Sequence, residues 1–241
     1  MSPIDPTSPI RQRWRITFAC GLRDASDGRP RDLADAWSEA LAGTALDGGS
    51  GLPFVTVNGR PRIVLAMPLP DSMAAERDLL DVFLTDRIPV GSVRRAIESS
   101  VPSGCTVTDL HDVWVGEPAL PGQVIGADYR IDLGVEPASA AGSLATAAAG
   151  LMAAATLPRT RAKGGSSKAY DLRPLVARLA VIDVGPPTAL RVRTVVDPSR
   201  GGGRPDEVVA ALAEHAGVRL SIAQATRERI LLAGDDEHAG G

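Results

Sequence analysis

The sequence predicts an α+β protein made of two tandem ferredoxin-like (βαββαβ) halves, each with an antiparallel sheet. Three observations lead to this fold class. In the first half, strand-length apolar segments and helix-length amphipathic segments follow the order strand, helix, strand, strand, helix, strand. A link rich in proline and glycine spans residues 116–122, and a similar order begins again after it. The 241 residues, 44% of them hydrophobic, are enough to bury two cores.

The expected domain boundaries follow from changes in composition. The start, MSPIDPTSPI, is rich in proline, and the end, GDDEHAGG, is polar, so disordered tails are predicted at residues 1–10 and 234–241. Between them we expect an N-terminal half at residues 11–118 and a C-terminal half at residues 123–233.

Two strands of the first half are predicted close together. Residues 63–67, IVLAM, form a continuous apolar run between prolines, which is too short for an isolated helix and typical of a buried strand. Residues 79–84 form a second apolar run that is interrupted by Asp81. Asn58-Gly59, ahead of the first run, predicts a turn or bulge.

The first strand of this half shows strict alternation. In residues 12–18, tryptophan, isoleucine and phenylalanine alternate with polar side chains, which predicts a half-buried strand. Because successive side chains point to opposite faces, Arg13 and Arg15 are expected on the face that the helices leave uncovered. The other elements predicted in this half are a helix at residues 33–41 with Asp32 as its cap, a helix at residues 91–101 and a strand at residues 106–115.

The second half has a less regular middle. Alternation at residues 129–133 predicts a strand, and the alanine-rich stretch after it predicts a helix. Pro205 begins another helix whose first turn is acidic, which suits the helix dipole, and Gly217 ends it. Further strands are predicted at residues 168–172, 189–196 and 218–232.

Composition limits the partners and cofactors. The formal charge of −3 argues against wholesale adsorption to nucleic acid, and the aromatic content of 3% leaves few rings for base stacking. Cys20 and Cys105 are far apart in the sequence and have no Cys or His at metal-ligand spacing, so we expect no zinc or iron–sulfur site and no other cofactor. The start lacks the features of a signal peptide, and the alanine-rich stretch is too weakly apolar for a membrane span. We therefore expect a cytoplasmic protein that does not bind membranes.

Several motifs occur together in an order that resembles one protein family. They are GRPRIVLAMPLP, the following LLDVFL, the PSG turn before Cys105, and later KAYDLRPLV and GGGRPDEVVAAL. With these motifs, residues 11–232 resemble the radical SAM-linked protein family, a domain of unknown function that is fused to radical SAM proteins of the B12-binding type or encoded beside them. The resemblance implies an accessory role to a radical SAM partner. In place of the family's FLSHLDL-type and YSxGFxPxPR-type motifs this chain has CGLRDASDGRPRDL and PFVTVNGRPRI, without the His and the Gly-Phe pair.

Arginines on strands are the residues most indicative of binding. Alternation places Arg13 and Arg15 on the open face of the first sheet, and Arg191 and Arg193 on the open face of the second. Open sheets of this fold class receive single-stranded RNA, and arginine contacts with phosphate make such binding salt-dependent. The alternative is that polar residues cover an open face in any case, with arginine as the default cation of a chain whose 26 basic residues include only two lysines.

A basic segment in the second half adds further candidates. It holds both lysines and a flexible Gly-Gly-Ser-Ser sequence, which suits either a hairpin that grips phosphate or an acidic partner, or a solvated loop. The residues predicted to bind nucleic acid or a partner are, in full, Arg13, Arg15, Arg60, Arg62, Arg161, Lys163, Lys168, Asp171, Arg173, Arg191 and Arg193.

Three other features carry weaker functional interpretations. The glycine triplet at residues 201–203 precedes a helix, but it fits neither Walker nor dinucleotide spacing, and the acidic first turn of that helix would repel an anion. The three histidines are isolated from one another. Asp171 and Arg173 of the DLRP motif are expected to form an ion pair or a turn cap rather than a substrate site.

From these features we predict a non-catalytic accessory domain that presents a basic surface to RNA or tRNA, or to a radical SAM partner. No catalytic, cofactor-binding or metal-binding residue is predicted. The alternative is an RNA-modifying or RNA-processing enzyme, because tandem ferredoxin-like folds include RNA nucleases and pseudouridine synthases. Those synthases depend on an aspartate in a defined cleft, and the sequence does not place one.

Overall fold

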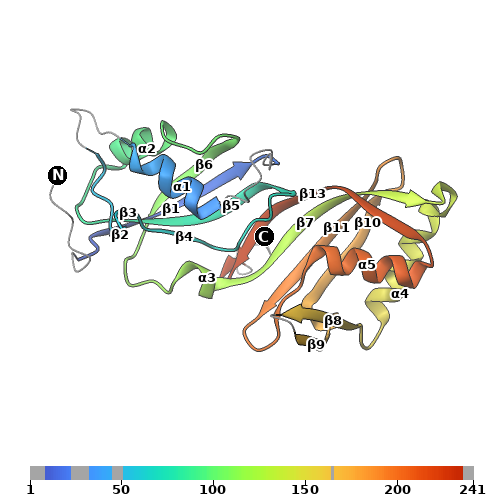
Figure 1. Cartoon of the computed structure of the whole chain (residues 1–241). Helices are drawn as coiled ribbons and strands as arrows, with labels where there is room; N and C mark the ends of the chain where they lie inside the picture. Colours follow the sequence, from blue (N-terminus) through green and yellow to red (C-terminus); the bar gives the residue numbers. More distant parts are fainter. Residues whose placement is uncertain (1–8, 23–32, 45–50, 164–165, 236–241) are drawn as a thin grey trace. The chain divides into compact units, whose positions relative to one another are not determined.

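The computed structural model describes residues 9–22, 33–44, 51–163 and 166–235. The chain divides into two compact units, Met1–Val124 and Ile125–Gly241. Each unit combines helices with mostly antiparallel strands (Figure 1), so the α+β class is as predicted. Most of the two predicted tails, and the predicted helix cap Asp32, lie outside the described residues.

The sheet of the first unit is centred on β1 (Gln12–Cys20). It pairs antiparallel with β5 (Met73–Leu84) on one side and with β6 (Cys105–Val113) on the other. β4 (Ile63–Leu65) pairs antiparallel with β5, which gives the order β4-β5-β1-β6. β4 lies within the first apolar run that the sequence predicts as a strand, and β5 contains the second run but begins earlier, at Met73.

Two helices pack on this sheet. α1 (Leu33–Ala42) lies against β4, and α2 (Val90–Glu98) lies against β6. The alternating apolar residues of β1 are buried, and the ring of Phe18 meets the ring of Trp37 edge-on, with 5.2 Å between their centres. The alternation predicted for β1 is confirmed, although both faces of the strand are buried rather than one.

A small hairpin formed by β2 (Thr56–Val57) and β3 (Arg60–Pro61) precedes β4. Its turn residues Asn58 and Gly59 have φ values of 51° and 77°. Positive φ at both central residues is the geometry for which Asn-Gly is favoured, so the predicted turn is confirmed. The unit ends with the short helix α3 (Leu120–Gln123).

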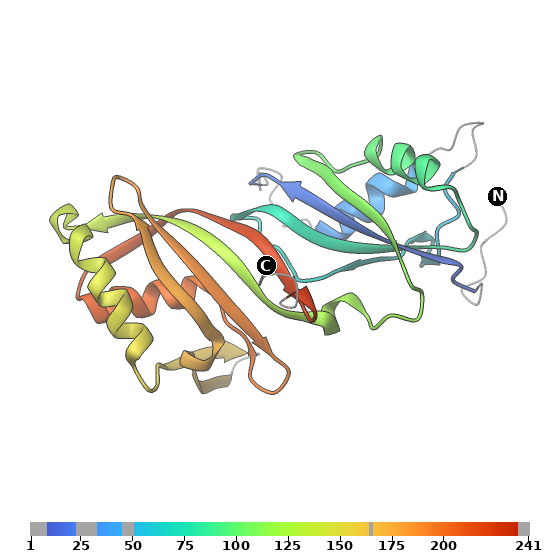
Figure 2. The same cartoon turned by 180° about the vertical axis from the view of Figure 1, so that it is seen from behind.

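The sheet of the second unit has the order β10-β11-β7-β13. β11 (Thr188–Asp197) pairs antiparallel with β10 (Val176–Asp183) and with β7 (Val124–Glu136). β13 (Arg219–Leu232) is the neighbour of β7 on its other side. Figure 2 shows β10 and β11, in orange, running beside β7.

The helices of the second unit pack on this sheet and on each other. α4 (Leu144–Ala153) contacts β10 and α5, and α5 (Pro205–Ala216) contacts β13. Leu151 of α4 and Leu212 of α5 are fully buried. As predicted, α5 begins at Pro205 and ends at Gly217, whose φ of 66° suits a helix C-cap. The short elements of this unit are η1 (Ala138–Ser143), η2 (Arg173–Leu175) and β12 (Gly201–Gly202), which pairs with β11.

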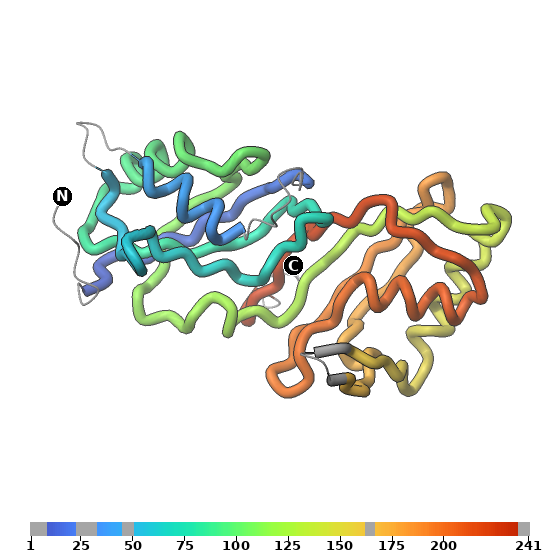
Figure 3. Tube along the Cα trace, viewed as in Figure 1, coloured from blue at the N-terminus to red at the C-terminus, as the bar shows by residue number. Residues whose placement is uncertain are grey.

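The irregular middle of the second half differs from the prediction. The strand predicted at residues 168–172 is β9 (Ser166–Asp171), and it pairs only with β8 (Pro158–Lys163) in a separate hairpin. The strand that enters the main sheet here is β10, which the sequence does not reveal. The register of β10 against β11 shifts twice, so its buried residues Val176 and Leu179 are three apart and the period of two is lost. Figure 3 traces the chain through these elements.

Two further findings concern membranes and metals. Of the helices in the described ranges, none has the length and apolar character needed to cross a membrane. Within the same ranges, no group of three or more His, Cys, Asp or Glu side chains is placed to hold a metal ion.

Candidate nucleic-acid interface

The structure buries two of the arginines that the sequence predicts to be exposed. Arg13 and Arg15 lie on the face of β1 opposite the Phe18 side, as alternation requires, but only 2% and 6% of their surfaces are exposed. The prediction that they form an open basic surface is therefore wrong. The two arginines can be buried because a carboxylate within the sheet pairs with them.

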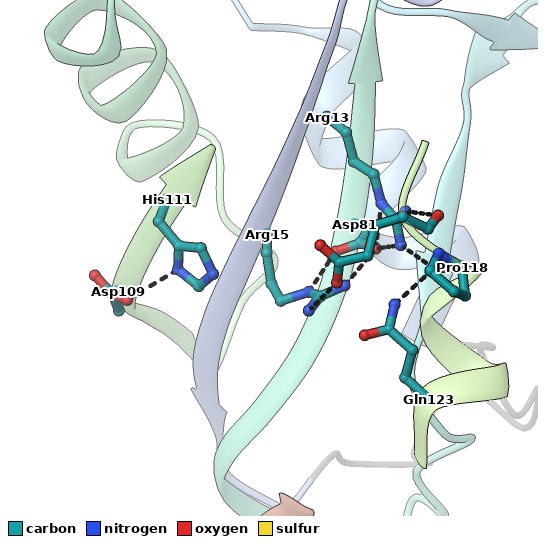
Figure 4. A network of polar contacts seen from close by, with 8 residues as sticks. Arg13, Arg15, Asp81, Asp109, His111, Pro118 and Gln123 are labelled. Carbon is teal, nitrogen blue, oxygen red and sulfur yellow. Dashed lines mark hydrogen bonds and ion pairs between the residues drawn. The ribbon is translucent and has the colours of Figure 1, made fainter. Parts of the chain in front are cut away.

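That carboxylate belongs to Asp81, which interrupts the apolar run of β5. Asp81 lies directly opposite Arg15 in the pairing of β1 with β5 and is itself fully buried. It accepts hydrogen bonds from Nε of Arg13 at 2.8 Å and from Nε of Arg15 at 2.9 Å (Figure 4). Two buried cations thus share one buried anion, and buried charges require such partners.

The segment after β6 supplies further acceptors. The backbone carbonyls of Glu117 and Pro118 accept hydrogen bonds from the two terminal nitrogens of Arg13, at 2.7 and 2.9 Å. The Glu117 carboxylate lies 3.4 Å from Nη1 of Arg15, and the Gln123 amide donates to the Pro118 carbonyl at 2.6 Å. The segment that the sequence predicts as a link therefore also completes the polar core of the first unit.

Arg60 and Arg62 line a groove of about 490 Å³ beside α1 and the β2–β3 hairpin. Arg60 is exposed, and its guanidinium group lies 3.9 Å from the carboxylate of Asp35. The guanidinium carbon of Arg62 lies 4.5 Å from the centre of the Phe83 ring, which is a cation–π distance. Both arginines are accessible, and their role in binding stays a prediction.

The basic segment of the second half forms the β8–β9 hairpin, and its central cation is neutralised. Nε and Nη2 of Arg161 donate to the two carboxylate oxygens of Glu207 at 3.1 and 2.7 Å. The same guanidinium group lies over the ring of Tyr170, whose hydroxyl donates to Glu207. Because Glu207 is in the first turn of α5, these contacts fasten the hairpin to the helix instead of leaving Arg161 for a phosphate. Lys168 is exposed, and the side chain of Lys163 lies outside the described residues.

The proton affinities of this cluster follow from its contacts. Burial acts to raise the pKa of Glu207, but the hydrogen bonds from Arg161 and Tyr170 outweigh it and hold that pKa below its ordinary value. Burial and the hydrogen bond to Glu207 raise the pKa of Tyr170 to about 12. The arrangement favours an ionised carboxylate beside a neutral phenol.

We expect the Tyr170 phenol to ionise near pH 12 rather than near its ordinary value of about 10. Since the raised pKa favours the protonated form, its contribution to folding is present below about pH 10 and is lost as the pH rises through about 12. Ultraviolet titration of the phenolates measures this, with circular dichroism to confirm that the chain is folded. Tyr170→Phe leaves only Tyr129 to titrate, and Glu207→Gln should move the Tyr170 transition toward the ordinary pKa. Ionisation of Tyr170 near pH 10 in the folded wild-type chain would contradict this arrangement.

The DLRP motif forms a turn cap, as expected, and the role of Asp171 and Arg173 in binding stays a prediction. Oδ1 of Asp171 accepts hydrogen bonds from the backbone N–H groups of Leu157 and Arg173, at 2.7 and 3.0 Å. These two N–H groups lower the pKa of Asp171. Arg173 in turn donates to the carbonyls of Met152 and Val176. The motif therefore caps and braces the turn that leads into β10.

Close packing accounts for the last residue of the glycine triplet. A Cβ atom on Gly203 would lie 2.3 Å from the carbonyl oxygen of Leu175 and 3.1 Å from Cβ of Thr194. The other two glycines form β12 and pair with β11. The triplet is thus explained without a bound phosphate.

The second sheet has a charged face on the side opposite its buried apolar residues. The alternate residues of β11 are fully buried, so Arg191 and Arg193 point to the other face. The register places Arg191 opposite Arg130 of β7, and Arg193 opposite Asp128. We call this surface the open face; by register and contacts its charged residues are Arg130, Arg178, Arg191, Arg193, Arg229, Asp128, Asp132, Asp183 and Glu228.

Asp128 is shared by two arginines of the open face. Nε of Arg193 lies 2.7 Å from one carboxylate oxygen, and Nε of Arg229 lies 2.8 Å from the other. Burial acts to raise the pKa of Asp128, but the hydrogen bonds from Arg193 and Arg229 outweigh it and lower that pKa. One ionised carboxylate therefore faces two guanidinium groups.

The next row of the open face contains two matched pairs. Arg191 binds both carboxylate oxygens of Glu228, at 3.1 and 3.0 Å, and Arg130 lies 3.2 Å from Asp132. The side chains of Arg191 and Arg130 are 44% and 45% exposed. Both guanidinium groups remain accessible to a ligand from solvent.

Arg178 adds a cation without a matching carboxylate. It lies on β10 directly opposite Arg193 and is exposed. Its side chain forms no hydrogen bond or ion pair with any residue in the described part of the chain. The open face therefore carries five arginines against four carboxylates, a small local excess of positive charge on a protein of net charge −3.

Sequence reasoning does not assign three of these arginines to the open face. Arg130 is in the alternating segment of β7, so extending the argument used for Arg191 would have found it. Arg178 lies on the unpredicted strand β10. Arg229 is near the end of the long strand β13, where no simple alternation holds.

The fold and this face define an α+β protein with antiparallel sheets and an arginine-rich open face. The chain belongs to the family described as "Uncharacterized protein conserved in bacteria (DUF2344)", which it matches over residues 57–205. No curated protein matches it. Among solved structures it is similar to a chain of the Cbf5-Nop10-Gar1 complex, with a TM-score of 0.48 and 8% sequence identity. That similarity covers 92% of this chain and 50% of the other, so the chain spans about half the length of its structural neighbour.

Proposed function

We propose that this protein is a non-catalytic accessory protein that binds RNA through the open face of its second unit. The observation that carries the proposal is the excess of arginine there, with Arg178 unmatched and Asp128 shared between Arg193 and Arg229. A phosphate group on this face would meet guanidinium groups that are already ordered by their neighbours. Arginine is well suited to this contact because its planar fork binds phosphate through two hydrogen bonds.

The proposed mode is recognition of the sugar–phosphate backbone. No residue that the pairing of β7, β10 and β11 places on the open face is aromatic, so these strands offer no platform for stacked bases. Phosphate contacts carry no sequence information by themselves. We therefore expect RNA binding to show little preference for sequence and to weaken strongly as the salt concentration rises.

The fold proposal is that both units are ferredoxin-like halves. Its support is the strand order, which is β4-β5-β1-β6 in the first unit and β10-β11-β7-β13 in the second. Numbered by sequence within each unit, both sheets read 2-3-1-4, and a helix follows the first strand and precedes the last in each. The β8–β9 hairpin is then an insertion in the second half.

The RNA proposal predicts opposite effects for two substitutions on the open face. Arg178→Glu should weaken binding of labelled single-stranded RNA about tenfold and reduce the salt dependence by about 0.7 in the slope of log K against log salt. Asp128→Asn should strengthen binding, because it removes the negative charge between two arginines. Fluorescence anisotropy over a series of salt concentrations measures both.

Arg87→Glu is the matched control for charge. Arg87 is an exposed arginine of the first unit, so the substitution makes the same change in net charge away from the open face. It should leave the salt slope unchanged. If Arg178→Glu and Asp128→Asn bind RNA as the wild-type chain does, the open face is not the RNA-binding surface.

We further propose that the protein works beside a radical SAM protein. The support is the resemblance of its motifs to the radical SAM-linked family; all of these motifs except GGGRPDEVVAAL lie wholly within residues 57–205. Affinity purification of the tagged chain from its native host should recover a radical SAM protein. A purification that repeatedly recovers no such protein under conditions that preserve complexes would count against it.

The non-catalytic part of the proposal has its own test. Bulk RNA incubated with the purified chain should keep its length and its nucleoside composition, as measured by gel electrophoresis and mass spectrometry. Turnover that is lost on substitution of one carboxylate would favour an RNA-modifying or RNA-processing enzyme instead.

A further inference from the structure

The two cysteines of the chain meet across the first sheet. Cys20 ends β1 and Cys105 begins β6, 85 residues later in the sequence. They are directly opposite in the antiparallel pairing of these strands, and their Sγ atoms lie 2.7 Å apart. The two side chains therefore point at each other.

An irregularity in the strands creates this pairing. Up to Thr17, which lies opposite Asp109, the residues of β1 and β6 match one for one; Phe18 then lies opposite Val107. Thr108 has no residue opposite it on β1, and its hydroxyl donates to the Thr17 carbonyl at 3.1 Å. Without this shift Cys20 would lie opposite Thr106, and a one-residue slip would turn Cys105 to the other face.

Both cysteines lie in the core. Their exposed fractions are 2% for Cys20 and 7% for Cys105, and Phe18, on the same face of β1 as Cys20, is fully buried. Residues directly opposite in antiparallel strands have Cα atoms about 4.5–5.5 Å apart, which is within the range that a disulfide spans. The backbone therefore needs no rearrangement to accept a covalent link.

We propose that Cys20 and Cys105 form a redox modification site at which a small-molecule disulfide converts the two thiols into a cross-strand disulfide. The thiolate of one cysteine attacks a sulfur of the small disulfide, which expels one small thiolate and leaves a mixed disulfide. The thiolate of the other cysteine then attacks the protein sulfur of that bond, forms the Sγ–Sγ bond and releases the second small thiol. Two protons leave the cysteines, and two electrons reduce the small disulfide to two thiols.

The link would tie the edge strand β6 to the central strand β1. It encloses α1, β4, β5 and α2 in one covalent loop, so it restricts the unfolded chain more than the folded one. Because the sulfur atoms are buried, exchange takes place while the unit folds or opens locally. This site is independent of the RNA proposal, which concerns the second unit.

The first test uses the wild-type chain, unfolded and then refolded in a mixture of reduced and oxidised glutathione. After acid quenching, denaturation and treatment with N-ethylmaleimide, the intact mass should be about 2 Da below that of the reduced chain, without maleimide adducts. Proteolysis should yield one peptide pair joined through Cys20 and Cys105. Two maleimide adducts, or retained glutathione, on the refolded chain would overturn the proposal.

The second test measures the consequence for stability. The thermal midpoint of the first unit, followed by tryptophan fluorescence, should be higher without reductant than with it by about 5–10 °C. The Cys20→Ala/Cys105→Ala chain should show the same midpoint in both conditions. A reductant-dependent shift that persists in this double variant would assign the effect to another cause and refute the site.

Discussion

Replacing Asp81 with alanine is expected to lower the free energy of unfolding of the first unit by about 3–5 kcal/mol. The substitution removes the one carboxylate that the buried guanidinium groups of Arg13 and Arg15 share. Hydrogen bonds to backbone carbonyls remain for Arg13, but they do not balance its charge. Urea denaturation followed by tryptophan fluorescence measures the loss, because all three tryptophans of the sequence lie in this unit.

Two further variants test whether the lost stability comes from the buried charges or from the loss of any ion pair. Glu98→Ala removes a carboxylate of the same unit that pairs with Arg94 at 3.5 Å on the surface, and it should cost less than about 0.5 kcal/mol. Replacing Arg13 and Arg15 with methionine and Asp81 with leucine removes all three buried charges together. This triple variant should recover most of the stability that Asp81→Ala loses. Equal effects of Asp81→Ala and Glu98→Ala would show that the buried network does not hold the unit together.

Gly203→Ala is expected to destabilise the second unit by about 3 kcal/mol. The new Cβ atom would lie 2.3 Å from the carbonyl oxygen of Leu175, a distance that a Cβ atom does not tolerate. The backbone of η2 or of the segment after β12 must move to relieve it. Urea denaturation followed by far-ultraviolet circular dichroism should show the loss, while the tryptophan signal of the first unit stays unchanged.

Gly202→Ala is the matched control for this substitution. A Cβ atom on Gly202 would lie 3.6 Å from Cγ2 of Val196, which is an ordinary van der Waals contact. The change should cost less than about 1 kcal/mol. If both substitutions leave stability intact but weaken binding of inorganic phosphate, the triplet is a phosphate loop and the packing explanation is wrong.

Much of the fold could be predicted because its signals are local. Alternation located β1, β7 and β11, and the apolar runs located β4 and part of β5, because strand side chains repeat every two residues. Proline and glycine marked both ends of α5. β10 lacks such a local signal, because its two register shifts remove the alternation that marks a strand.

Less of the candidate site could be predicted. Alternation correctly placed Arg191 and Arg193 on the open face, but the same argument for Arg13 and Arg15 gave the right face and the wrong exposure. The sequence contained one sign of this, because Asp81 interrupts an apolar strand and a buried carboxylate needs cations nearby. Nothing local, however, indicates which arginines a buried aspartate will meet.

By itself, the sequence determined the α+β class of the fold, the positions of several strands and helices, and the face of the strand on which each alternating residue lies. These properties depend on neighbours within a few positions along the chain. The tertiary structure alone decided that Arg13 joins Asp81, 68 residues away, that Cys20 meets Cys105, and that the open face of the second unit keeps an unmatched arginine. Burial and pairing depend on which distant segments come together, and strand periodicity carries no information about that choice.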